Sequence, residues 1–256
     1  MGKIGIYLLA NYPSREAFIE AVRICDKENI DFLEIGFPFS DPIADGDVLE
    51  KACYDTLQRY NFDDTINSLH DAQRIFRGKI YIMTYTNVVY GPGIENFIMR
   101  LGNISGIILA DLPLREVKPF EKLFNKHGIP VIRFLTPESR DEDIDNAVKS
   151  ARDFIYFVSK RGTTGGEFTL GEETQAKISR AKGKGGVVFL GFGIKDRKDI
   201  ELAFQYADGA IIGTKAISEL EQGTDIFRSY IGRLKKEDYP GGAKPPGTLS
   251  PSCERS

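Results

Sequence analysis

Residues 32–47 read FLEIGFPFSDPIADGD, a short apolar run followed by a loop that two prolines stiffen. The run FLEIG (32–36) has the length and composition of a buried β-strand. Successive side chains of a strand point to opposite sides, so Leu33 and Ile35 share one side and Glu34 lies on the other. A carboxylate inside an apolar strand is rare in soluble proteins, and its place in the fold therefore needs an explanation.

Similar runs recur along the whole chain and are separated by amphipathic helical patterns. The expected strands are residues 4–10, 32–36, 79–85, 106–110, 130–135, 154–159, 186–191 and 209–213. Helices are expected from near Ser14, Asp64, Gly93, Leu114, Arg140, Glu172, Asp196, Thr214 and Thr224. Strands that alternate with helices in this way predict a single (β/α)8 TIM barrel. The alternative is an open doubly wound sheet, which normally has a Gly-rich turn after its first strand; here that turn reads ANYPS.

Composition excludes several classes of function. The 256-residue chain has a net charge of −3 with acids and bases interspersed, so neither nucleic acid nor a membrane surface is an expected partner. Cys25, Cys53 and Cys253 have no metal-type or redox-type spacing, which is typical of reduced thiols in a cytoplasmic protein. His70 and His127 have no companion ligand nearby. We therefore expect no metal site, and catalysis that depends on carboxylates.

The chain shows no internal domain boundary, and the barrel is expected to span residues 1–237. Residues 238–256 are rich in Pro, Gly and Ser and cannot bury an apolar face. This segment is predicted to be a disordered tail, and its composition also suits a cloning remnant.

Glu34 is the first candidate catalytic residue, because TIM-barrel chemistry takes place at the C-terminal ends of the strands. If Leu33 and Ile35 face the helices, Glu34 lies inside the barrel. Loss of water there raises a carboxyl pKa above its usual value of about 4.3. The alternative is an ion pair with a base on a neighbouring strand, for which Arg133 is the candidate. Asp41 and Asp45 share the following loop, and on spacing alone local turn chemistry is the better explanation for each of them.

Glycines mark three strand ends in the last third of the chain. They lie in FVSKRGTTGG (157–166), GFG (191–193) and GAIIGTKAISEL (209–220). Backbone N–H groups at a helix N-terminus bind anions, and barrels of this kind bind phosphate after strands seven and eight. These residues predict a small phosphorylated substrate but do not name it. The sequence contains no P-loop, so a nucleoside triphosphate is not expected.

At this level of detail the chain resembles the tryptophan synthase α subunit family. The family's second-strand signature is matched by Glu34-Ile35-Gly36, Pro38-Phe39-Ser40-Asp41-Pro42 and Ala44-Asp45-Gly46. The match continues in order, over about residues 4–236, through MTYTN (83–87), ADLPL (110–114), Tyr156 to Ser159, Gly162-Thr163-Thr164-Gly165, GFGI (191–194) and Gly213-Thr214.

The resemblance implies retro-aldol cleavage of indole-3-glycerol phosphate to indole and glyceraldehyde 3-phosphate, in the last steps of tryptophan biosynthesis. Glu34 would be the general acid/base that protonates C3 of the indole ring and helps to remove the proton of the glycerol hydroxyl. Asp45 would accept a hydrogen bond from the indole N–H and stabilise the cation. A buried carboxyl group and one in a polar loop would then have separate pKa values, with Asp45 permanently ionised.

The same resemblance implies roles for other positions. Backbone groups would hold the phosphate near Gly165, Gly193, Gly213 and Thr214. Thr164 would close over the site and contact the loop aspartate. The indole pocket would be lined by Tyr85, Ile108, Tyr156 and Phe192, and plain packing inside the barrel is the alternative for each.

The family passes indole to a β subunit that carries pyridoxal phosphate, so we expect an α2β2 assembly and no cofactor in this chain. Three interpretations compete with this one. The chain could be a stand-alone lyase that releases free indole, or a weakened scaffold that only activates the β subunit. The third is another phosphate-binding barrel, such as a sugar-phosphate isomerase. The chain departs from the family at Asn11-Tyr12, in place of Gly-Asp, and at Lys160-Arg161. It also reaches its first strand at residue 4, without the short helix that usually precedes it.

Overall fold

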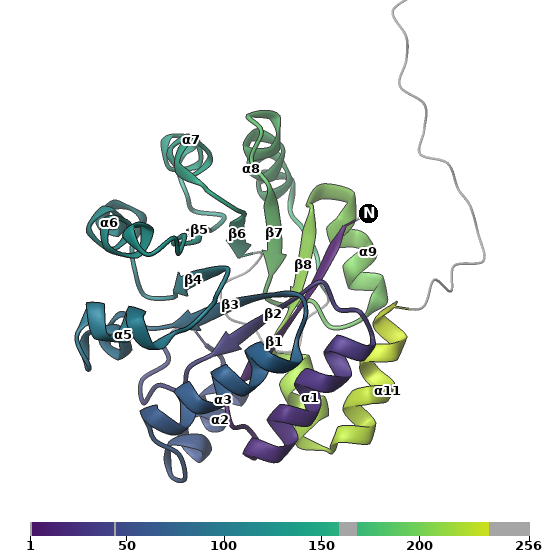
Figure 1. Ribbon diagram of the computed structural model, residues 1–256. Coiled ribbons are helices and arrows are strands. Elements are labelled where there is room, and N and C mark those ends of the chain that lie inside the picture. Colours follow the sequence, from purple (N-terminus) through teal and green to yellow (C-terminus); the bar gives the residue numbers. More distant parts are fainter. Residues whose placement is uncertain (1, 44, 159–167, 236–256) are drawn as a thin grey trace, which may run out of the picture.

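The computed structural model describes residues 2–43, 45–158 and 168–235. Eight parallel strands form one sheet in the order β4-β3-β2-β1-β8-β7-β6-β5, with helices around it (Figure 1). The strands are β1 (Lys3–Leu9), β2 (Phe32–Gly36), β3 (Lys79–Thr84), β4 (Gly106–Leu109), β5 (Arg133–Leu135), β6 (Ile155–Val158), β7 (Val188–Gly191) and β8 (Gly209–Ile212). The predicted TIM barrel is confirmed.

The two ends of the sheet meet between β4 and β5. Ile107 forms an isolated parallel bridge with Val131, and its N–H donates to the Pro130 carbonyl at 2.9 Å. The N–H of Ile132 donates in turn to the Ile107 carbonyl at 2.8 Å. The strand predicted over residues 130–135 is regular only over Arg133–Leu135. Residues 130–132 instead close the barrel against Ile107.

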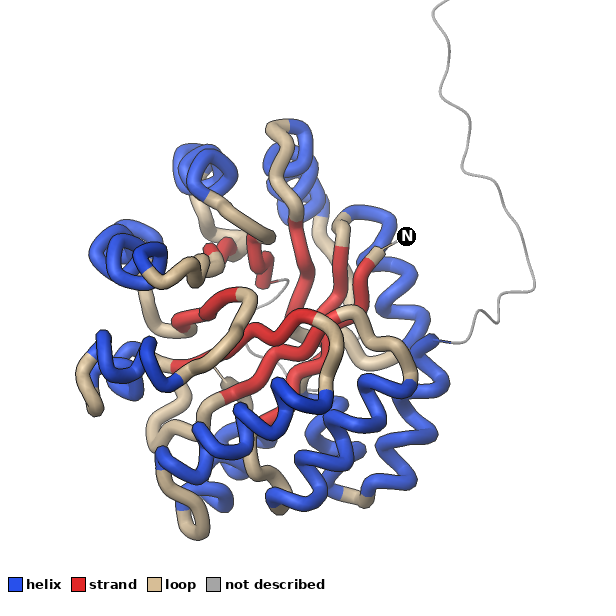
Figure 2. The backbone as a smooth tube through the Cα atoms, viewed as in Figure 1, coloured by secondary structure: helices blue, strands red, loops and turns tan. Residues whose placement is uncertain are grey.

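Helices surround the strands on the outside of the barrel (Figure 2). They are α1 (Arg15–Lys27), α2 (Asp47–Leu57), α3 (Phe62–Ile75), α4 (Thr86–Tyr90), α5 (Ile94–Arg100), the 3-10 turn η1 (Leu114–Glu116), α6 (Val117–Lys126), α7 (Asp141–Ser150), α8 (Glu172–Gly183), α9 (Arg197–Tyr206), α10 (Thr214–Glu221) and α11 (Thr224–Lys235). Each expected helix is present near its predicted start. Helices α2 and α4 were not among those expected from the sequence.

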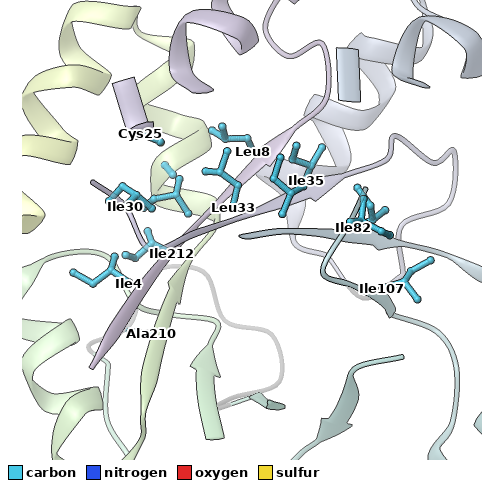
Figure 3. Close-up of a cluster of buried hydrophobic side chains, with 14 of the residues drawn as sticks. Ile4, Leu8, Cys25, Ile30, Leu33, Ile35, Ile82, Ile107, Ala210 and Ile212 are labelled. Carbon is cyan, nitrogen blue, oxygen red and sulfur yellow. The ribbon is translucent and has the colours of Figure 1, made fainter. Parts of the chain in front are cut away.

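The outer core lies between the strands and the helices. Leu33 and Ile35 of β2 belong to it, together with Cys25 of α1 and Ile82 of β3 (Figure 3). All four are buried. The side of β2 that faces the helical layer is therefore the one predicted from alternation, and this leaves Glu34 on the inner side.

A second core fills the barrel interior, and its base is a layer of aromatic rings. Phe32 stacks on Phe189 with ring centroids 5.2 Å apart, and Phe189 stacks on Phe154 at 4.3 Å. Gly5 makes room for this layer on β1, because a Cβ atom there would lie 2.2 Å from the Phe32 ring. The floor of the interior is thus packed and rigid, and open space for a ligand is expected only toward the C-terminal ends of the strands.

The described ranges also limit other kinds of function. None of the helices within them is long and apolar enough to cross a membrane. Residues 2–43, 45–158 and 168–235 contain no group of three or more His, Cys, Asp or Glu side chains placed to hold a metal ion. The predicted tail over residues 238–256 lies outside the described part of the chain, so the domain limit at residue 237 remains a prediction.

Replacing Gly5 with Ala tests the packing of the aromatic floor. The new methyl group meets the Phe32 ring, and overpacking of this kind should lower the free energy of unfolding by about 1–3 kcal/mol. Gly183 is the matched control, because a Cβ there has no neighbour within 4 Å. Gly183→Ala should be neutral or slightly stabilising. Urea denaturation followed by circular dichroism measures both; equal stability of the two variants would contradict the packing described.

Candidate active site

Glu34 lies in the barrel interior, directly paired with Tyr7 on β1 and Tyr81 on β3. The residue is only 1% exposed, and its Oε2 atom has no hydrogen-bond partner among the described residues. Burial raises the pKa of Glu34 to about 8, and the nearby charge of Asp45 contributes to the same shift. At neutral pH this carboxyl group is therefore mostly protonated and has a proton to donate.

Arg133 does not neutralise Glu34. Its guanidinium group pairs with Glu121 on α6, on the outer side of β5. Burial lowers the pKa of Arg133, and the charge of Glu121 opposes that shift. The ion-pair interpretation of Glu34 is therefore wrong, and the inward carboxyl group is left without a basic partner from that strand.

The structure distinguishes the two acids of the loop after β2. The Tyr85 hydroxyl donates to Asp45 Oδ2 at 3.0 Å, and Asp45 is half-buried at the mouth of the barrel. Asp41 is exposed and accepts a hydrogen bond from the Ser40 hydroxyl at 2.5 Å, which is ordinary turn chemistry. Asp45 is therefore the loop acid that joins Glu34 at the site.

The surroundings of Asp45 are less polar than the sequence indicates. Burial raises its pKa to about 6, although the hydrogen bond from Tyr85 lowers it. Asp45 is consequently ionised at neutral pH but not at every pH, in contrast to the permanent charge expected from the resemblance. The pKa of Glu34 is still higher than that of Asp45. Glu34 can therefore hold a proton to donate at a pH at which Asp45 is charged.

Tyr7 also belongs to the site, although it was not among the candidate residues of the sequence. Its hydroxyl lies over Gly36, where a Cβ atom would be 2.0 Å from the Tyr7 oxygen. Burial raises the pKa of Tyr7 far above its usual range, with further contributions from Asp45, Cys53 and Glu34. Alternation in β1, which puts Gly5 and Tyr7 on one side, is the signal that would have found it.

The predicted pocket residues all lie inside the barrel or at its mouth. Ile108 and Tyr156 are buried in the interior core. Phe192 is half-buried and meets Tyr156 edge-on, with ring centroids 6.2 Å apart. Tyr85 stacks on Phe39 with ring centroids 4.9 Å apart, and Phe39 belongs to the loop between β2 and α2 (residues 37–46), the acid loop. An apolar, aromatic surface therefore adjoins the two carboxyl groups, as a planar apolar ligand requires.

Three of the predicted phosphate-binding residues lie at the ends of β7 and β8. Gly213 precedes α10, and Thr214 is the first residue of that helix. Gly193 has φ +86°, a conformation that glycine adopts without strain. A Cβ atom at Gly213 would lie 3.7 Å from Tyr7 Cβ, so the predicted phosphate site adjoins the strand that is paired with Glu34. Thr164 and Gly165 lie outside the described residues.

Helix α2 covers the mouth beside Asp45. It begins directly after Gly46, and its inner face places Leu49, Ala52 and Cys53 in the interior core. Their spacing, continued by the buried Thr56, is the i, i+3, i+4, i+7 pattern of an amphipathic helix. The sequence therefore contained the signal for α2, although this helix was not expected.

Comparisons with known proteins agree with this geometry. The family model of the tryptophan synthase alpha chain matches residues 4–239. The tryptophan synthase alpha chain of Christiangramia forsetii is 33% identical over 242 residues, which cover 91% of this chain and 93% of that protein. Tryptophan synthase from Mycobacterium tuberculosis superposes with a TM-score of 0.83 at 28% identity, covering 91% of each chain. A chain of the Pyrococcus furiosus tryptophan synthase complex gives a TM-score of 0.80 at 25% identity, covering 91% of this chain and 97% of that one.

The residues matched by the family model include the two carboxyl groups and the glycine-bearing strand ends. The chain therefore belongs to the tryptophan synthase alpha chain family, the carbon–carbon lyases of tryptophan biosynthesis that cleave indole-3-glycerol phosphate.

Proposed function

We propose that Glu34 and Asp45 carry the cleavage of indole-3-glycerol phosphate in this chain, as general acid/base and as electrostatic stabiliser. The observation that supports this most is the pair itself. Glu34 in the barrel interior is close enough to Asp45 at the mouth for the Asp45 charge to contribute to its raised pKa, and pKa values of about 8 and about 6 leave Glu34 mostly protonated and Asp45 mostly ionised at pH 7. That is the combination that proton transfer to a ring with developing positive charge requires.

The reaction follows from these two states. The protonated Glu34 gives its proton to C3 of the indole ring, and positive charge develops toward the ring nitrogen. Asp45 accepts the N–H hydrogen bond and stabilises that charge. The Glu34 carboxylate then takes the proton of the glycerol hydroxyl, the bond between C3 and the side chain breaks, and its electrons return to the ring. Indole and glyceraldehyde 3-phosphate result, and Glu34 is protonated again.

The substrate phosphate would be held at the ends of β7 and β8. The first backbone N–H groups of a helix have no partner within the helix and favour an anion. Gly213 lets the phosphate approach the first turn of α10, and Thr214 adds a hydroxyl donor. Gly193 would donate from the turn after β7, and Gly165 from the loop after β6. Thr164 would close that loop over the acid loop.

The indole ring would occupy the space bounded by Tyr85, Ile108, Tyr156 and Phe192. Tyr85 is well suited to link this pocket to the charge on Asp45, because it stacks on Phe39 and donates to Asp45 at 3.0 Å. Exclusion of water by these rings strengthens the hydrogen bond between Asp45 and the indole N–H.

The partner would be a tryptophan synthase β subunit in an α2β2 assembly. Two large apolar side chains are exposed near the mouth: Ile43, 82% exposed and two residues before Asp45, and Tyr90, 55% exposed at the end of α4. Exposed groups of this kind near a functional rim are typical of a protein interface. Pyridoxal phosphate would belong to that β subunit, and no cofactor is expected in this chain. The free, buried thiols of Cys25 and Cys53 support a cytoplasmic location.

Substitution of the carboxyl groups tests their assigned roles. Glu34→Gln keeps the shape but cannot transfer the proton, and should lower kcat for indole release by about 10²–10⁴. Asp45→Asn removes the charge and should also lower kcat by at least about 10². Asp41→Asn changes the neighbouring, exposed acid of the same loop and should leave kcat within about twofold.

An indole-release assay on indole-3-glycerol phosphate, with and without a β subunit, measures all three variants. Full indole production by Glu34→Gln, with the β subunit still activated, would favour the scaffold interpretation and contradict the acid/base role. Full turnover of the unmodified chain without any β subunit would favour a stand-alone lyase.

The exposed Tyr90 tests the position of the interface. Tyr90→Glu should weaken association with a β subunit at least about tenfold, because a charge then replaces an aromatic anchor. Val187→Asp is the matched control: Val187 is also exposed (43%), but it precedes β7 at the opposite end of the barrel. Analytical ultracentrifugation or calorimetric titration gives both affinities. If both variants weaken association equally, or if neither weakens it, the interface lies elsewhere.

A further inference from the structure

Helices α2 and α10 are joined at the mouth by a cluster of three side chains, Tyr12, Lys51 and Glu221. Lys51 Nζ donates to Glu221 Oε1 at 3.2 Å and to Asp55 Oδ2 at 2.8 Å. Burial raises the pKa of Tyr12 to about 12, and the Glu221 carboxylate, as a hydrogen-bond acceptor and a negative charge, adds to that shift. The cluster therefore connects the end of β1, the first half of α2 and the last residue of α10.

Tyr12 reaches this position because the chain turns sharply after β1. Asn11 adopts φ +65°, and its Oδ1 accepts a hydrogen bond from the Ser68 hydroxyl at 2.5 Å. The Tyr12 N–H donates to the Leu9 carbonyl at 3.1 Å. Tyr12 is then only 2% exposed and belongs to the same interior core as Ala52 of α2. The departure from Gly-Asp at Asn11-Tyr12 thus places a phenol group beneath α2.

The contacts differ in strength. The ion pair between Lys51 and Glu221 joins two side chains that are 63% and 44% exposed, and such pairs contribute little to stability. The Tyr12 hydroxyl is different, because a buried donor that loses its partner carries a desolvation cost. The cluster is therefore better suited to fix a geometry than to hold the fold together.

The two helices that it joins carry opposite ends of the site. Helix α2 starts at Asp47, two residues after Asp45, and α10 starts at Thr214. Ile217 of α10 packs in the same interior core as Leu49 of α2. A change in the spacing of these helices moves the acid loop relative to the phosphate site.

We propose that Tyr12, Lys51 and Glu221 are positioning residues that set the distance between Asp45 and the phosphate-binding end of α10. This inference rests on the proposed roles of Asp45 and Thr214. Helix α10 follows β8 directly, whereas α2 follows a loop, so loosening the cluster displaces Asp45 more than it displaces the phosphate site. Loss of the cluster should therefore lower kcat and leave KM nearly unchanged.

A double-mutant cycle with Asp45 tests this proposal in the full chain. Tyr12→Phe removes only the hydroxyl and should lower kcat about threefold to tenfold, the factor that a lost hydrogen bond is worth, with KM within about twofold. Lys51→Met should act in the same direction. In the Asp45→Asn background each change should alter kcat by less than about twofold, because the group that they position is already gone. Arg74→Met, which breaks an exposed ion pair with Asp71 on α3, is the control and should change neither constant.

The outcomes separate this inference from the proposed function. An equal loss of kcat from Tyr12→Phe in both backgrounds shows a structural effect independent of Asp45 and overturns the positioning role, as does unchanged kcat in Tyr12→Phe and Lys51→Met. A normal kcat in Asp45→Asn itself contradicts the proposed function and removes the basis of this inference as well. A loss of kcat that occurs only when Asp45 is intact supports the positioning role.

Discussion

The interior of the barrel leaves Glu34 with very little water, and the behaviour of the site follows from that. The carboxyl group is 1% exposed, and its Oε2 atom has no partner among the described residues. Charging such a group is unfavourable, so its pKa rises from 4.5 to about 8. Because the folded state holds this proton more tightly than the unfolded chain, Glu34 contributes stability below about pH 4 that is lost as the pH rises toward 8. The protein tolerates this cost at the position where a transferable proton is needed.

The surroundings keep Glu34 and Asp45 different although both are partly withdrawn from water. Asp45 accepts a hydrogen bond from Tyr85, which stabilises its charged form, and its pKa rises only to about 6. The rigid aromatic floor beneath the site and the cover of α2 above it restrict the relative movement of the two groups. A difference in hydrogen bonding and exposure thus assigns two carboxyl groups to two roles.

Much of the fold was predictable because its signals are local. Alternation in FLEIG placed Leu33 and Ile35 in the outer core and Glu34 inside, and this prediction needed no knowledge of distant contacts. Strand β5 was predicted too long because Pro130 and Val131 close the barrel by a single bridge, which depends on the position of β4. Helix α2 had a clear apolar stripe that was overlooked beside the proline-rich loop.

The site was predictable only in part, because its chemistry depends on distant residues. Tyr7 faces Glu34 through the register of β1 and β2, which a single sequence does not display. The raised pKa of Asp45 results from burial by elements far along the chain, so the loop looked more polar than it is. Arg133 was a reasonable partner for Glu34 by composition, and its pairing with Glu121 follows from the outward side of β5.

The most direct test is a titration of the two carboxyl groups themselves. Carbon-13 labelling of glutamate and aspartate side chains gives carboxyl signals by nuclear magnetic resonance, and Glu34→Gln and Asp45→Asn identify which signal belongs to which residue. We expect apparent midpoints near pH 8 and pH 6, with the higher one lost in Glu34→Gln. Midpoints near pH 4 for both groups would show that neither carboxyl group is withdrawn from water, and would contradict the division of the pair into a proton donor and a charged stabiliser.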